Sequence, residues 1–225
     1  MINFYDIKIK TFCALFFSFP LFLVNAQHNT VETWWTETIR LYEQTSQIQP
    51  SRTVTEVIEL DAQGRIKSSE ITETRYERIG SEERVIVLRN GVDVSADRRN
   101  QRQRNNNSSE GFGAMPFDAR YAPLTVRTSI STLNNITLVS YTISTQAGPV
   151  EGIAHFSENG HLTYIEQVWL KPSGAVSAMR AECYFDYQNG IPIITRINFE
   201  GSASVLFIKR HFRMNIENFD WTRKP

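Results

Sequence analysis

The side chains best suited to chemistry are few in this chain and lie far apart. Four histidines and two cysteines occur among its 225 residues. His155 and His161 flank an Asn-Gly turn and could meet across a hairpin, but they offer only part of the ligand set of a catalytic zinc site, which is normally about three side chains. The motifs of hydrolase elbows, phosphate-binding loops, dinucleotide-binding turns and zincin helices do not occur in the sequence. We therefore expect no enzyme activity, no metal site and no cofactor.

Cys183 is the cysteine that bears on the folded part of the chain. It lies in the segment 179–187, where apolar side chains alternate with polar ones, as in a strand with one buried face. Free cysteine is among the most buried residue types, so we expect an inert core side chain. The alternative, a nucleophile, would need a histidine within reach, and the sequence places none there.

Residues 94–121 contain a polar run with four arginines and no aliphatic side chain. These arginines are Arg98, Arg99, Arg102 and Arg104. Such a run cannot bury a core, and a long excursion of this kind is usually functional or disordered. Two interpretations stay open: a basic flap that contacts lipid headgroups, phosphate or a partner protein, and a solvated loop. The apolar stretch that follows, residues 111–117, is expected to pack back onto the fold.

The N-terminus has the features of an export signal. Lys8 and Lys10 precede a nearly continuous apolar run that ends in small residues at Ala26. This order describes a secretory signal peptide, residues 1–26, cleaved after Ala26. The run is shorter than the roughly 20 residues that span a bilayer, and an uncleaved anchor is the alternative. Export would place the chain in the periplasm or cell envelope, with no stable membrane span after cleavage.

Residues 27–225 have the length of one domain. The whole chain carries 24 basic and 24 acidic residues, so its formal charge of zero predicts no affinity for nucleic acid. Hydrophobic residues make up 41% of the sequence, which is enough for a sizeable core.

One amphipathic helix is predicted over residues 30–47. Its apolar positions recur at three- and four-residue steps and include Trp34, Trp35 and Leu41. The paired tryptophans favour packing on a sheet over a membrane-interface anchor, because the opposite face of the helix is acidic rather than basic.

After Pro50 the sequence turns to short β-branched and aromatic runs separated by turn residues. Dipeptides such as Asn90-Gly91, Asn159-Gly160 and Asn189-Gly190, and a further turn at Gly201-Ser202, delimit about ten strands. Connections this short allow only antiparallel pairing between neighbours. The predicted fold is mainly β (α+β): a curled antiparallel meander or unclosed barrel with the N-terminal helix as a lid.

Alternation along the strands predicts which side chains line the interior of this curled sheet. Because one helix has too little apolar area to fill such a trough, either side chains or a ligand must fill it. The predicted lining, gated by the tryptophans, consists of Trp34, Trp35, Leu41, Phe117, Tyr164, Val168, Phe185, Ile193, Ile197, Phe199 and Phe212.

The order of these features resembles the LolA-like superfamily of bacterial outer-membrane lipoprotein-sorting proteins. The resemblance rests on the leader, the helix, the Asp-x-x-Gly hairpin turns, the excursion that ends in Met115-Pro116-Phe117-Asp118, and a closing strand that runs to Trp221. It implies an unclosed antiparallel barrel with a helical lid and a cavity for lipoprotein acyl chains, with neither cofactor nor catalysis. The arginine- and asparagine-rich excursion departs from the carrier pattern.

Two functions of different classes follow from the sequence. The first is an exported carrier that holds the acyl chains of a lipid or lipoprotein in the apolar cavity. The second is an envelope protein-interaction module with a filled core, which would bind its partner through the basic excursion or a sheet edge.

Overall fold

The structure, a computed structural model, describes residues 30–79, 82–96, 114–146, 148–170, 176–205 and 208–224. The predicted signal peptide and the four arginines of the excursion, Arg98, Arg99, Arg102 and Arg104, lie outside these residues. Their predicted roles therefore stay predictions. The chain divides into two compact units, Met1–Glu37 and Thr38–Pro225.

The N-terminal helix covers 30–43 of the described residues and belongs to both units. Its buried side chains are Val31, Trp35 and Thr38, at steps of four and three residues, as expected of an amphipathic helix. A short 3-10 turn, η1 (Gln44–Gln47), takes up the last residues of the predicted helix. Within the described residues, no helix has the length and apolar character needed to cross a membrane.

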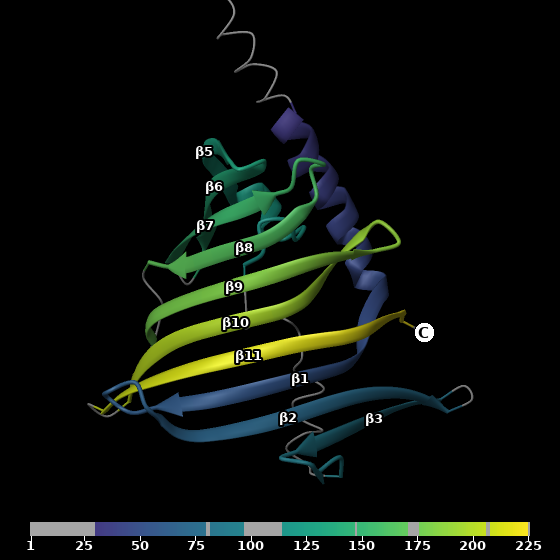
Figure 1. Ribbon diagram of the computed structural model, residues 1–225, viewed down its shortest axis with the longest axis vertical. Coiled ribbons are helices and arrows are strands. Elements are labelled where there is room, and N and C mark those ends of the chain that lie inside the picture. Colours follow the sequence, from purple (N-terminus) through teal and green to yellow (C-terminus); the bar gives the residue numbers. More distant parts are fainter. Residues whose placement is uncertain are drawn as a thin grey trace, which may run out of the picture. The chain divides into compact units, whose positions relative to one another are not determined.

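Over the described part of the chain, eleven strands form a single antiparallel sheet, in the order β4-β3-β2-β1-β11-β10-β9-β8-β7-β6-β5 (Figure 1). The first four are β1 (Ile48–Leu60), β2 (Ile66–Ile79), β3 (Glu82–Arg89) and β4 (Val92–Asp93). After the 3-10 turn η2 (Ala122–Leu124) come β5 (Thr125–Leu133), β6 (Ile136–Thr145), β7 (Gly148–Phe156), β8 (Leu162–Trp169), β9 (Val176–Gln188), β10 (Ile191–Val205) and β11 (Ile208–Arg223). The sheet ends at β4 and β5 without closing, which confirms the predicted mainly β, unclosed fold.

Turn residues explain the meander. Asn90-Gly91, Asn134-Asn135 and Asn189-Gly190 all have positive φ, the backbone conformation of tight two-residue hairpin loops. The predicted turn at Gly201-Ser202 is wrong, because both residues lie inside β10. Gly201 pairs with Phe212 of β11, and a Cβ on Gly201 would meet the Phe212 ring at 2.5 Å. The glycine is therefore needed for close packing rather than for a turn.

The last strand in the sequence lies near the middle of the sheet. β11 pairs with β10 on one side and with β1 on the other, so that Ile48 of β1 is opposite Arg223. The long pairing of β1 with β11 joins the meander β5–β11 to the meander β1–β4 (Figure 1).

One face of the sheet, here called the buried face, carries most of the core over β6–β10. Its fully or almost fully buried side chains include Tyr141, Ile143, Val150, Phe156, Leu162, Ile165, Gln167, Ala181, Cys183 and Phe199. The opposite face is here called the polar face. It carries Arg180, Asn198 and Asn215.

Candidate functional site

The predicted cavity residues divide between the two faces. Those on the buried face are Phe185, Ile197, Phe199 and Phe212, of which Phe185 and Phe199 are buried. Phe199 and Phe212 stack with ring centroids 5.9 Å apart, and Trp169 meets the Phe199 ring at 6.1 Å. These aromatic side chains pack on one another as a core does.

Tyr164 and Val168 lie on the polar face, which corrects their predicted place in the interior. The register of β7 with β8 changes between His155 and Phe156. The side chains of β8 that follow Leu162 therefore face the side opposite to the one that simple alternation from Leu162 predicts. Tyr164 is therefore opposite Tyr184, and Val168 is opposite Arg180. A β-bulge of this kind inserts one residue and reverses the facing of all that follow.

Ile193 is displaced for the same reason. β10 carries an irregularity between Ile194 and Arg196, so Ile194 is the residue opposite Phe185 and Ile193 is opposite Asp186. Ile193 thus belongs to the polar face, although it is buried there.

The segment Ala114–Phe117 fills part of the buried face, as the sequence predicted. All four of its residues are buried, and Phe117 is 0% exposed. The amide of Gln167 donates a hydrogen bond of 2.7 Å to the carbonyl of Ala114, and the Phe117 ring meets Phe156 edge-on at 6.3 Å. The segment is therefore part of the core.

The last turn of the helix approaches the same region through Tyr42. Burial, with Cys183 and Asp118 nearby, raises the pKa of the Tyr42 hydroxyl. Burial likewise raises the pKa of the Cys183 thiol to about 12, which keeps it protonated. The predicted burial of Cys183 is thus confirmed. Of the other helix residues with a predicted role, Trp35 is buried, whereas Trp34 and Leu41 are half-buried.

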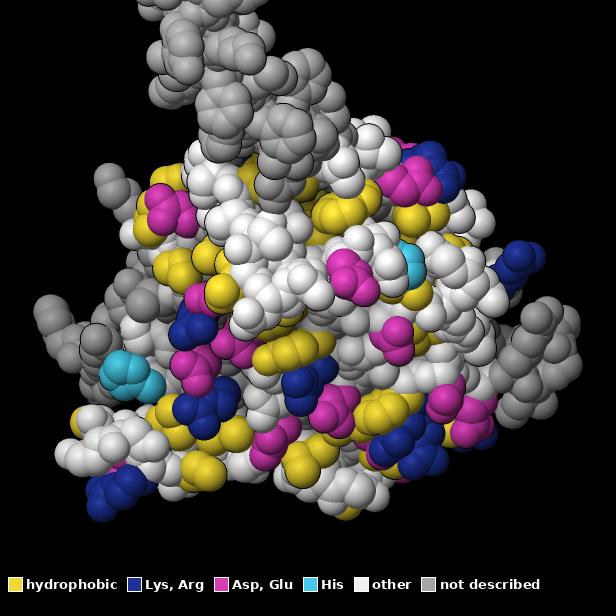
Figure 2. Space-filling view, turned by 45° about the horizontal axis from the view of Figure 1, so that its top comes forward, with side chains coloured by type: hydrophobic (Ala, Val, Ile, Leu, Met, Phe, Trp, Pro, Cys, Tyr) yellow, Lys and Arg dark blue, Asp and Glu magenta, His cyan; other side chains and the backbone are white. Residues whose placement is uncertain are grey.

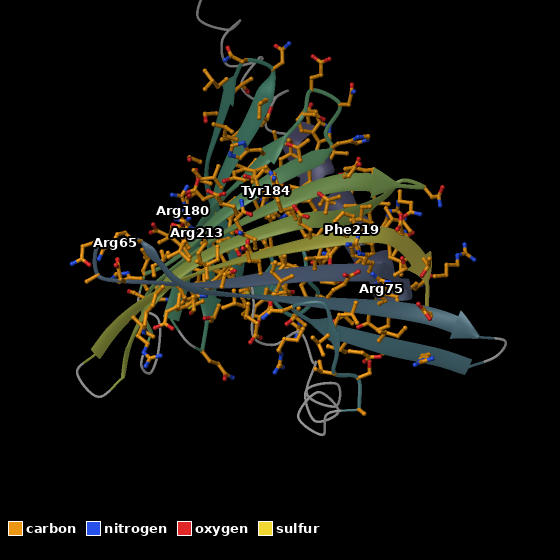
Figure 3. All side chains as sticks on the ribbon, turned by 60° about the horizontal axis from the view of Figure 1, so that its bottom comes forward. Arg65, Arg75, Arg180, Tyr184, Arg213 and Phe219 are labelled. Atoms are coloured by element: carbon orange, nitrogen blue, oxygen red, sulfur yellow. The ribbon has the colours of Figure 1, made fainter. Side chains whose placement is uncertain are left out.

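A groove of about 670 Å³ lies on the polar face across β2, β1, β11, β10 and β9. Its volume is within the range of ligand sites, about 300–1,000 Å³. Its lining is mostly charged or amide-bearing: Val54, Glu56, Ile71, Arg180, Glu182, Arg196, Asn198, Glu200, Arg213, Asn215 and Glu217. Figure 3 labels Arg180 and Tyr184 of β9 and Arg213 of β11 among the side chains of these strands.

A repeated motif generates the centre of the groove. The triplet Arg-x-Asn-x-Glu occurs in β10 as residues 196, 198 and 200, and again in β11 as residues 213, 215 and 217. Antiparallel pairing places Arg196 opposite Glu217, Asn198 opposite Asn215, and Glu200 opposite Arg213. The arrangement is nearly symmetric about the two asparagines.

Hydrogen bonds connect the asparagines to carboxylates on the outer strands. Asn215 donates to Glu56 at 3.0 Å, and Asn198 donates to Glu182 at 3.3 Å. Arg180 bridges Glu182 and Glu166, at 3.1 and 3.0 Å. Glu166 also lines a second hollow of about 600 Å³ on the polar face over β5–β8.

The two Arg/Glu pairs that the repeat places opposite each other differ in their contacts. Arg213 binds Glu200 at 2.7 Å, and these two residues are here called the closed pair. Arg196 instead stacks on the ring of Tyr184, with its guanidinium carbon 4.0 Å from the ring centroid. Arg196 and Glu217 are here called the open pair, because the described residues contain no ion pair for either of them. Both side chains are exposed.

Sequence reasoning did not find this groove. The signal was present in the repeat of Arg-x-Asn-x-Glu, whose spacing of two residues places all three side chains on one face of a strand. Within the described residues, no group of three or more His, Cys, Asp or Glu side chains could hold a metal ion.

No protein-family model and no curated protein matches the chain. Solved structures do match it, among them the following three. A DUF1329 family protein from Desulfovibrio piger is 9% identical, with 86% of this chain and 93% of that chain covered and a TM-score of 0.41. MucB in complex with MucA(peri) is 7% identical, with 84% and 99% covered and a TM-score of 0.22. The MucA/MucB complex of Pseudomonas aeruginosa is 6% identical, with 85% and 99% covered and a TM-score of 0.17. Values this low support no conclusion about function.

Proposed function

We propose that the chain is a non-enzymatic protein-interaction module of the cell envelope, with a filled core and the polar groove as its contact surface. Export rests on the leader segment of the sequence. The observation that carries the proposal is the location of the groove: it lies on the polar face, whereas the buried face is packed with its own side chains.

The chemistry of the groove suits a polypeptide partner. Its lining holds glutamates, arginines and asparagines together, so it offers hydrogen-bond donors, acceptors and both signs of charge. On the face that Figure 2 shows, basic and acidic side chains are also interspersed rather than gathered into a field of one sign. Mixed charge gives specificity for a complementary surface and little general attraction for a polyanion.

Carriage of acyl chains stays the other prediction, from the resemblance to the LolA-like superfamily. It requires an apolar hollow large enough for a chain. Phe117, Phe199 and Cys183 occupy the buried face at 0–2% exposure, which favours a filled core on that part of the sheet.

Site-specific photo-crosslinking in the source cell tests the contact surface. Ile71 lines the groove and is 45% exposed, so a photoreactive residue in its place leaves the charged network intact. Ile66 is the matched control, because it lies on the same strand, is 68% exposed and does not line the groove. We expect a discrete protein adduct from position 71 that position 66 does not give.

Extraction of the same protein, purified without detergent, tests the carrier. Mass spectrometry is expected to find no lipid in near-stoichiometric amount. Stoichiometric lipid, or equal adducts from positions 71 and 66, would contradict the proposed function.

A further inference from the structure

The closed pair and the open pair of the Arg-x-Asn-x-Glu repeat differ in their contacts although their backbone positions are equivalent. Directly opposite residues on antiparallel strands have Cβ atoms about 4.5–5.5 Å apart, close enough for an arginine and a glutamate to pair. Arg213 and Glu200 do so, and Arg196 and Glu217 do not. The difference lies in the next strand, where Tyr184 is opposite Arg196.

Tyr184 holds Arg196 in a state suited to binding. The guanidinium carbon of Arg196 lies over the Tyr184 ring, 4.0 Å from its centroid, and the Tyr164 ring on β8 lies 5.1 Å from the Tyr184 ring. When the guanidinium stacks on a ring, the N–H groups along its edge remain available. They can donate two hydrogen bonds to a carboxylate in a bidentate arrangement. Glu217 is left exposed beside it, with the apolar Val54 as its neighbour on β1.

We infer that the open pair is the anchor of the groove for an extended polypeptide segment. Arg196 binds an acidic side chain of that segment, and Glu217 binds a basic one. This inference rests on the proposed function and names the chemistry of the partner.

The spacing of the pair supports an extended segment. Alternate side chains of an extended chain point to the same side, about 6.6–6.8 Å apart. This is wider than the roughly 4.5–5.5 Å between the Cβ atoms of opposite residues, and the long, exposed side chains of Arg196 and Glu217 can spread to that distance. An acidic and a basic residue separated by one position can therefore meet Arg196 and Glu217 together. Val54 and Ile71 give the groove apolar contact for the rest of the segment.

A peptide titration of the full exported chain tests the inference. The probe is acetyl-Asp-Ala-Lys-amide, and its neutral counterpart is acetyl-Asn-Ala-Gln-amide. Backbone amide shifts in nuclear magnetic resonance report binding. We expect the charged peptide to move the signals of Arg196 and Glu217 and to bind about fivefold more tightly than the neutral one.

Variants separate the open pair from general charge effects. Arg196→Gln and Glu217→Gln should each remove most of the preference for the charged peptide. Arg75→Gln is the matched control, because Arg75 lies on the polar face outside the groove, bound to Glu73 at 2.7 Å. Tyr184→Ala should also weaken binding, since Arg196 is then free to close on Glu217, and Tyr184→Phe should restore binding relative to it.

Equal affinity for the two peptides, or an unchanged preference in Arg196→Gln, would overturn the inference. Tighter binding of a neutral oligosaccharide such as chitotriose than of the charged peptide would overturn it too. If position 71 still crosslinks to a protein in that case, the proposed function stands and only the anchor is wrong.

Discussion

His155 on β7 lies in surroundings that disfavour its charge. Burial lowers the pKa of its imidazole, against a smaller opposing effect of Glu166, and its ring meets Tyr164 edge-on at 4.8 Å. The folded protein therefore keeps His155 neutral to a lower pH than the unfolded chain does. Its contribution to stability is full above the usual pKa of about 6.5 and is lost as the pH falls from there toward the lowered folded value.

We expect His155→Gln to lose less thermal stability than the natural protein between about pH 7 and about pH 5. Melting curves at several pH values measure the difference. His161→Gln is the control, because His161 is exposed in the adjoining turn. Parallel pH dependence in the natural protein and His155→Gln would contradict the prediction.

Cys183 should be almost unreactive in the folded state. With a pKa raised to about 12 by burial, its thiolate fraction at mildly alkaline pH is small. We expect alkylation by iodoacetamide to be about a thousandfold slower than for a free thiol and to reach the free rate in urea. Mass spectrometry of the exported protein over time measures both rates, and rapid native labelling would refute the prediction.

At the scale of elements, the segment Ala114–Phe117 packs on the sheet. Replacing Phe117 with Ala removes a fully buried ring that packs on Phe156, and should lower the free energy of unfolding by about 3–5 kcal/mol. Leu124→Ala is the control at the end of the same connection, since Leu124 is 46% exposed and should change stability by less than about 0.5 kcal/mol. Urea denaturation followed by circular dichroism measures both variants, and similar midpoints would contradict the packing.

The strands and turns were predictable from the sequence where the residues of a short segment determine the backbone conformation. The hairpins at Asn90-Gly91 and Asn189-Gly190 follow from residues that accept positive φ. The face to which a side chain points was not predictable beyond a β-bulge. The sequence placed Tyr164, Val168 and Ile193 in the interior, because alternation alone gives no sign of an inserted residue. The two-residue strand β4 was also missed, and with it the count of eleven strands.

At the scale of the molecule, β11 joins the two meanders of the sheet. A chain that ends at Val205 would leave both β1 and β10 without this partner. We expect it to lose the cooperative thermal transition in circular dichroism, whereas a chain that ends at Arg223 keeps it. A sharp transition in the shorter chain would show that the remaining strands fold without β11.

The groove could not be predicted from local sequence because it depends on the pairing of β1 with β11, which joins the two meanders. Its lining comes from β1 and β2 near one end of the chain and from β9, β10 and β11 near the other. Alternation along β11 is enough to place Arg213 and Glu217 on the face opposite Phe212. Which strands lie beside them is set by the pairing of β1 with β11, and no turn residue signals that pairing.

The closed and open pairs also give the groove a direction. A perfectly symmetric arrangement of charges would read the same from either end, and a bound strand could then lie in two opposite orientations. Tyr184 breaks this equivalence by holding one arginine of the two away from its glutamate. A strand anchored on the open pair would then bind in one orientation, and Tyr184 would be one source of that preference.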